Sequence, residues 1–138
     1  MFFLHAQLAR DCVVIGQFSL SQLLLMNDAN YPWFVLVPQR ENIREIFELD
    51  LADQQQLLCE SSFLAREMVE YFCPHKINIA ALGNIVPQLH LHHIARVTTD
   101  AAWPAPVWGK VPTKPYRDEA LLVLKNNFAQ TLIQKWNA

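Results

Sequence analysis

The chain has 138 residues, which predicts one domain with enough length to bury a substantial core. Hydrophobic residues make up 52% of it and charged residues 17%, so the composition excludes a disordered chain and predicts that some apolar surface is buried against a partner. The net charge of −2 provides no basic surface for a nucleic acid polymer, although a small nucleotide needs only a few well-aimed donors.

The sequence has no sign of a membrane or secreted protein. No apolar run approaches the roughly 20 residues that cross a bilayer, so we expect no membrane contact. The N-terminus has no basic leader followed by an apolar core, and it makes a poor signal peptide. Cys12, Cys59 and Cys73 lack metal-site spacing, and reduced thiols in a cytoplasmic protein are their simplest interpretation.

The first part of the chain predicts strands. Residues 12–18 and 20–27 have strand composition, with a turn between them. Residues 28–32 are rich in Asn, Asp and Pro and predict a sharp break. Residues 33–37 are apolar, aromatic and β-branched, which is typical of a buried central strand, and Pro38 is expected to close it because proline cannot donate to a sheet ladder.

Helices are predicted next. A short helix is expected over residues 42–48 and a long one over residues 51–73, with Asp50 as its N-cap and Pro74 as its stop. The long helix carries an apolar stripe at roughly helical spacing, formed by Leu57, Leu58, Leu64, Ala65, Met68 and Phe72. This stripe predicts a helix that covers one face of a sheet.

The C-terminal half predicts two more strands and a final helix. The strands are expected over residues 76–82 and 88–97, followed by a proline-rich loop over 100–112 and a helix over 118–136. Strands that surround one long helix predict an α+β fold with a mainly antiparallel sheet of about five strands. We expect a single domain over 1–138, with about 1–110 as its core and 111–138 as a C-terminal loop and helix.

Residues 88–94 read Gln-Leu-His-Leu-His-His-Ile and hold three of the five histidines. In an extended strand successive side chains point to opposite faces, so Gln88, His90 and His92 are expected on one face and His93 on the other. The pattern alone leaves three interpretations open: a packed histidine pair, a zinc site, or a nucleophile with its partner. Zinc is the weakest of them, because a catalytic site needs a third protein ligand and no other residue has a spacing that provides it.

The surrounding residues resemble a known family. Residues 84–96, Asn-Ile-Val-Pro-Gln-Leu-His-Leu-His-His-Ile-Ala-Arg, resemble the signature strand of the histidine-triad (HIT) superfamily. Residues 24–27 and 33–38 resemble the nucleotide-pocket strands of that family. The wider string, including Leu-Gly-Asn-Ile-Val-Pro and Trp-Pro-Ala-Pro-Val-Trp, is similar to a bacterial branch described as diadenosine-tetraphosphate-hydrolase-like. The resemblance covers nearly the whole chain and implies a HIT-like fold.

The resemblance also implies a chemistry. His90 matches the histidine that attacks the α-phosphate of a nucleotide conjugate and forms a nucleotidyl-histidine, which water then hydrolyses. His92 matches the last triad histidine, which implies phosphate binding. The implied protein is a nucleotide hydrolase or transferase that acts on a dinucleoside polyphosphate or phosphoramidate, without metal or other cofactor, and forms a homodimer. The alternative is a nucleotide-binding or regulatory module with little or no turnover.

Four further residues match binding positions of the family. Asn84 matches a polar residue near the phosphates, although a turn residue after glycine is an equal interpretation. Asn27, or Asp28 beside it, falls near the ribose-contacting position and has a turn initiator as its alternative. Arg96 resembles an arginine that follows the signature, and it is expected either beside the phosphates or in a surface ion pair.

Two residues depart from the family pattern. Gln88 replaces the first triad histidine, and glutamine keeps a donor and an acceptor but cannot titrate. Trp33 stands where many relatives carry a supporting histidine, and the loss of that partner is expected to alter the orientation and basicity of the catalytic rings. Neither change removes the nucleophile, so we expect a slow or differently specific enzyme.

Overall fold

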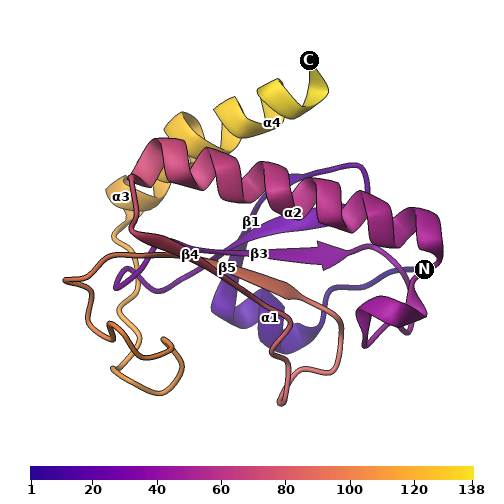
Figure 1. Ribbon diagram of the computed structural model, residues 1–138, viewed down its shortest axis with the longest axis horizontal. Coiled ribbons are helices and arrows are strands. Elements are labelled where there is room, and N and C mark those ends of the chain that lie inside the picture. Colours follow the sequence, from indigo (N-terminus) through magenta and orange to yellow (C-terminus); the bar gives the residue numbers. More distant parts are fainter.

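A five-stranded antiparallel sheet forms the centre of the computed structural model, which describes residues 1–138. Its strands lie in the order β1-β2-β3-β5-β4, and every neighbouring pair is antiparallel (Figure 1). Their bounds are β1 Cys12–Gln17, β2 Ser21–Met26, β3 Trp33–Pro38, β4 Lys76–Ala80 and β5 Leu91–Arg96. The predicted α+β fold is confirmed, and β3 lies at the centre of the sheet with every residue buried, including Pro38 at its end.

Helices pack on both faces of this sheet. Their bounds are α1 Ala6–Asp11, α2 Leu51–Phe72, α3 Asp118–Val123 and α4 Gln130–Asn137, with a π-helical segment, η2 Leu124–Ala129, joining the last two. The helix predicted over 42–48 is reduced to a 3-10 turn, η1 Ile46–Glu48. The sequence does not predict α1, because a six-residue helix is too short for an apolar stripe and its N-cap is a histidine, His5. No helix combines the length and the apolar character that a membrane span requires.

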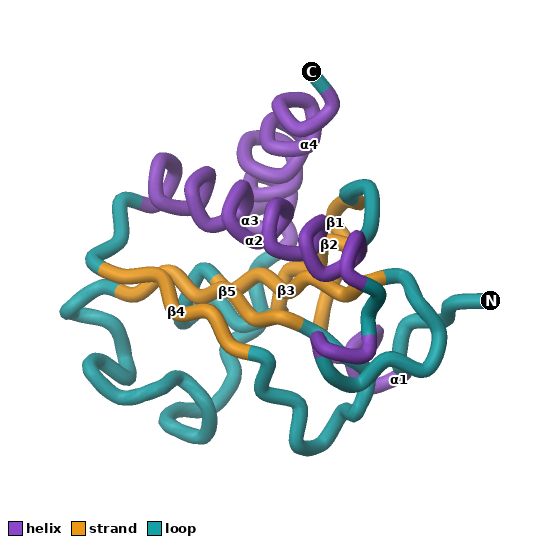
Figure 2. The backbone as a smooth tube through the Cα atoms, turned by 45° about the vertical axis from the view of Figure 1, so that its right-hand side comes forward, coloured by secondary structure: helices purple, strands orange, loops and turns teal.

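Helix α2 lies across one face of the sheet, as Figure 2 shows. Asp50 caps its N-terminus by accepting a backbone hydrogen bond in the first turn, and Cys73 ends it in the left-handed conformation just before Pro74. Leu58 is 68% exposed, so its predicted place in the buried stripe is wrong. Leu57, Leu64 and Met68 of α2 are buried in the apolar core against the sheet, and Phe63 and Phe72 pack against this core while partly buried.

The opposite face of the sheet is covered as well, by α1 and by the loops at residues 81–90 and 97–116 (Figure 2). A second apolar cluster fills this layer, and it includes Leu8, Trp33, Val35, Val86, Ile94 and Val107. Side chains of β5 that point away from α2 therefore enter a packed layer and not open solvent. This layer surrounds the candidate site.

Strand β5 is shorter than predicted, because it begins at Leu91 and not at residue 88. The N–H of Leu89 donates to the Ile43 carbonyl at 2.9 Å, and the carbonyl of Gln88 accepts from the ring of His90, so neither residue joins the sheet ladder. The strict alternation of faces applies only from Leu91 onward. The 81–90 loop leads into this strand and forms one wall of the site.

Candidate active site

His90 and His92 lie side by side on the face of the sheet that is turned away from α2. Their ring centroids are 4.8 Å apart and the rings are nearly perpendicular, at 75°. His93 points to the opposite face, where its Nε2 lies 2.7 Å from Ser61 Oγ of α2. The sequence-based separation of His93 from the pair is therefore correct.

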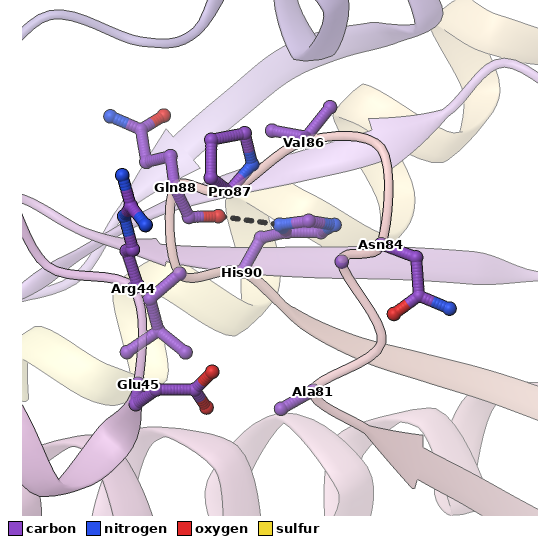
Figure 3. A pocket seen from close by; sticks show the side chains of 10 residues that line it. Arg44, Glu45, Ala81, Asn84, Val86, Pro87, Gln88 and His90 are labelled. Atoms are coloured by element: carbon purple, nitrogen blue, oxygen red, sulfur yellow. Dashed lines mark hydrogen bonds between the residues drawn. The ribbon is translucent and has the colours of Figure 1, made fainter.

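One nitrogen of His90 is held by the backbone and the other is free. Its Nδ1 lies 2.7 Å from the main-chain carbonyl oxygen of Gln88 (Figure 3). A carbonyl can only accept, so Nδ1 carries the proton and Nε2 carries the lone pair. Nε2 makes no hydrogen bond within the protein, and it is not among the buried polar atoms that lack a partner. Burial lowers the pKa of His90, an effect that outweighs the opposing Gln88 hydrogen bond, so the ring is neutral at pH 7.

Both nitrogens of His92 are engaged. The indole Nε1 of Trp33 donates to Nδ1 at 3.0 Å, and Nε2 lies 2.9 Å from the carbonyl oxygen of Leu82. Burial, followed by the neighbouring His90, lowers the pKa of His92 to about 4. The expected loss of a supporting partner at position 33 is thus wrong, because tryptophan supplies an N–H to the same ring.

A cavity of about 250 Å³ lies against His90, between the 81–90 loop and the residues that precede η1. Asn84 lines it, so the structure brings this predicted residue together with the histidine (Figure 3). Arg44 and Glu45 line it too, and the sequence offers no motif that nominates them. Gly83 allows the loop to approach the ring, because a Cβ at this position would lie 2.8 Å from Cε1 of His90 and 2.7 Å from the carbonyl oxygen of Val86.

The side chain of Gln88 points away from the ring of His90 (Figure 3). Its Oε1 accepts from the N–H of His5 at 2.9 Å, and its Nε2 donates to the carbonyl of Phe3 at 2.8 Å. These two bonds fasten the N-terminal segment, residues 1–5, to the 81–90 loop. The predicted catalytic place for the Gln88 side chain therefore needs correction: the residue acts on His90 through its main-chain carbonyl.

Asn27 and Asp28 lie at the end of β2, apart from the cavity of His90. Oδ1 of Asn27 accepts from the N–H of Tyr116 at 2.9 Å, and Oδ1 of Asp28 accepts from the N–H groups of Asn30 and Lys114. Both residues border a second cavity of about 310 Å³, which is also lined by Trp33. Trp33 thus lies between these residues and His92. The Oδ1 atoms that were expected to contact a ribose already accept backbone hydrogen bonds from Asn30, Lys114 and Tyr116.

Arg96 does not face the histidine cavity. Its guanidinium is buried and forms a bidentate ion pair with Asp100, with oxygens at 2.8 and 3.0 Å, and further bonds to Asn78 and to the carbonyl of Ala105. This pair, supported by three backbone N–H groups that also bind the carboxylate, lowers the pKa of Asp100 to about 2 although burial alone would raise it. Of the two expectations for Arg96, the phosphate-side position is wrong and the ion pair is correct, but the pair is buried rather than on the surface, and it fixes the start of the 97–116 loop.

Comparisons with known proteins identify the family of this chain. The HIT domain family matches residues 7–99, which is well over half of the chain, and the protein therefore belongs to the histidine-triad family. A histidine triad protein from Marinobacter aquaeolei VT8 is 51% identical, with 99% of this chain and 98% of that one covered and a TM-score of 0.95. A histidine triad protein from Bradyrhizobium japonicum is 46% identical, with 97% of each chain covered and a TM-score of 0.90.

A more distant structure supports the fold alone. The hypothetical histidine triad nucleotide-binding protein of Sulfolobus tokodaii is 11% identical, with 89% of this chain and 85% of that one covered and a TM-score of 0.66. No curated protein sequence matches the chain. No group of three or more His, Cys, Asp or Glu side chains is arranged to hold a metal ion. The particular bacterial branch within the family stays a prediction.

Proposed function

We propose that this protein is a nucleotide hydrolase or transferase that cleaves conjugates at the α-phosphate through a nucleotidyl intermediate on His90. The observation that carries the proposal is the asymmetry of the His90 ring. Its Nδ1–H is used by the Gln88 carbonyl, which leaves Nε2 as a free lone pair beside a cavity. A neutral imidazole in this tautomer is a competent nucleophile at pH 7.

The proposed reaction has two displacements at one phosphorus atom. The lone pair of Nε2 forms a bond to the α-phosphorus, and the bond from phosphorus to the leaving group breaks, so the leaving group departs with its electron pair. Water then forms a bond to the same phosphorus and loses a proton to solvent, while the bond to Nε2 breaks and its electron pair returns to the ring, which is again neutral, and a nucleoside monophosphate is released. Asn84, on the wall of the same cavity, is suited to donate its amide N–H to a phosphate oxygen.

A second candidate function is a nucleotide-binding module with little turnover. It is favoured by position 88, where glutamine replaces the first triad histidine and cannot titrate, and where its side chain is bonded to residues 3 and 5. Binding of AMP without any release from conjugates would favour this alternative.

We also propose a homodimer. Exposed apolar side chains of α2 and of the edge strand β4, including Leu51, Leu58 and Ile79, surround an apolar groove of about 500 Å³. Strand β4 has a free edge, because β5 is its single neighbour in the sheet. An apolar groove beside a free edge is suited to a second copy of the chain.

The three cysteines are free thiols, which supports a cytoplasmic location.

The direct test is release of AMP from diadenosine tetraphosphate and from adenosine phosphoramidate by the purified protein. His90→Ala is expected to abolish release from both substrates. His75→Ala is the matched control, because His75 is exposed at the start of β4 and lies outside the cavity of His90, and it is expected to retain activity. Release that survives in His90→Ala would contradict the proposed mechanism.

A further inference from the structure

The two ring nitrogens of His92 have partners that cannot exchange roles. The indole N–H of Trp33 can only donate, and it lies 3.0 Å from Nδ1. The carbonyl oxygen of Leu82 can only accept, and it lies 2.9 Å from Nε2. Nδ1 therefore holds the lone pair and Nε2 holds the proton. Since Trp33 is 6% exposed and His92 is 3% exposed, water cannot readily replace the Trp33 donor.

We propose that Trp33 is a positioning residue that holds His92 as a fixed, neutral Nε2–H donor, so that His90 is the single acid–base group of the pair. This inference rests on the proposed function, because the value of the fixed ring lies in what it does for the nucleophile beside it. A histidine at position 33 could donate or accept and could itself become charged, whereas an indole can only donate and stays neutral. Tryptophan thus removes a titrating group from the site and keeps the hydrogen bond.

The charge on His92 matters because of the intermediate. When Nε2 of His90 bonds to phosphorus while Nδ1 keeps its proton, the His90 ring becomes a cation. A protonated His92, with its ring centroid 4.8 Å away, would repel that cation in a poorly solvated site. A His92 that stays neutral does not oppose formation of the intermediate, and its ring edge still fixes the orientation of His90.

Apart from Trp33 and the Leu82 carbonyl, no group around the pair makes a hydrogen bond to His92. Trp108 of the 97–116 loop packs edge-on against His92, at 5.1 Å between centroids, but makes no hydrogen bond with it. His90 is the titratable group in contact with His92, and His93 lies on the opposite face. Arg44 and Glu45, which precede η1, line the cavity of His90 and do not contact His92, and His5 of the N-terminal segment lies on the His90 side.

The test is the side-chain ¹⁵N NMR spectrum of the histidines in the resting protein, which needs no substrate. In the wild-type protein we expect His92 to be protonated at Nε2 alone across the neutral range. In Trp33→Phe the donor to Nδ1 is lost while an aromatic ring and the Leu82 carbonyl remain, so Nδ1 becomes free to take a proton and the pKa of His92 should rise by about one unit. Trp108→Phe is the matched control, because it trims a packed indole without removing a hydrogen bond, and the His92 signals should keep the wild-type tautomer and pKa.

Two results would overturn the inference. One is a wild-type His92 that carries its proton on Nδ1 or titrates near the ordinary value of about 6.5. The other is a Trp33→Phe protein whose His92 signals match those of the wild type. In the activity assay, the acidic limb of the pH profile of kcat should gain a second ionisation in Trp33→Phe and not in Trp108→Phe. Since the NMR result is independent of turnover, an inactive wild-type protein would refute the proposed function and leave the role of Trp33 to be decided by the spectrum.

Discussion

Replacing Gly83 with alanine would push a methyl group into the contact between the 81–90 loop and the imidazole of His90. The new Cβ would lie 2.7 Å from the carbonyl oxygen of Val86 and 2.8 Å from Cε1 of His90. Carbon contacts in packed proteins are about 3.5–4.0 Å, so the loop or the ring has to move by roughly 0.7 Å or more. The backbone carbonyl of Val86 cannot rotate away as a flexible side chain could, so we expect part of this displacement to fall on the ring.

A misplacement of about 1 Å at a reacting group can lower a rate about 100-fold, so we expect Gly83→Ala to lower kcat for AMP release by between about 10-fold and 100-fold. Overpacking of this kind also costs about 1–3 kcal/mol of folding free energy. The assay is steady-state release of AMP from diadenosine tetraphosphate, together with urea denaturation to measure stability.

Gly109→Ala is the matched control. Gly109 has a φ of +72° and no atom within 4 Å of the position of a Cβ, so alanine there costs backbone strain of about 1 kcal/mol without a contact at the site. Both variants should lose stability, and Gly83→Ala alone should lose activity. A folded Gly83→Ala protein with wild-type kcat would refute the claim that the loop positions His90.

Four further outcomes are expected. First, the free energy of unfolding should fall as the pH is lowered from about 6.5 toward 4. The pKa values of His92 and His93 are about 4 in the folded protein and near 6.5 in the unfolded chain, so the unfolded chain binds more protons in this window. The free energies measured by urea denaturation at pH 7 and pH 5 should differ by about 2–4 kcal/mol, and equal values would contradict the assigned burial. Second, Asp100→Asn should destabilise the fold by about 3–5 kcal/mol, since it leaves the buried Arg96 without its carboxylate; a loss below about 1 kcal/mol by the same method would show that the pair contributes little. Third, Leu58→Glu should convert a dimer into a monomer in light scattering, whereas Leu122→Glu, at an exposed residue of α3 outside the groove, should not. A wild-type monomer at micromolar concentration would refute the dimer. Fourth, Gln88→Ala should lower kcat far less than His90→Ala, because its main-chain carbonyl remains, while proteolysis near residues 1–5 should become faster.

Sequence patterns predicted the elements whose signals are local. The buried run of β3 and the capped helix α2 depend on neighbours within a few residues, and both lie where the residues predict them. The pairing of His90 with His92 follows from alternation and family resemblance together. The family and the antiparallel α+β fold were therefore accessible from the sequence.

The errors concern contacts between distant residues. The side chain of Gln88 reaches the carbonyl of Phe3, which is 85 positions earlier, and no pattern in residues 88–94 indicates that partner. The role of Arg96 depends on Asp100 and on the loop that returns to it, so a cation after a signature strand could equally bind a ligand or a carboxylate. Trp33 was expected to deprive the site of a supporting partner because it lacks the imidazole of histidine, although its indole N–H donates a hydrogen bond to the His92 ring.

The central claim is that His90 forms a covalent nucleotidyl intermediate. The most direct measurement is mass spectrometry of proteolytic peptides after the protein is mixed with diadenosine tetraphosphate and quenched in alkali, in which a phosphorus–nitrogen bond to histidine survives. We expect a peptide that carries one added adenylyl group on His90, and we expect this peptide to be absent from His90→Ala. Full-rate AMP release with no adenylylated peptide, or with the adenylyl group on another residue, would contradict it.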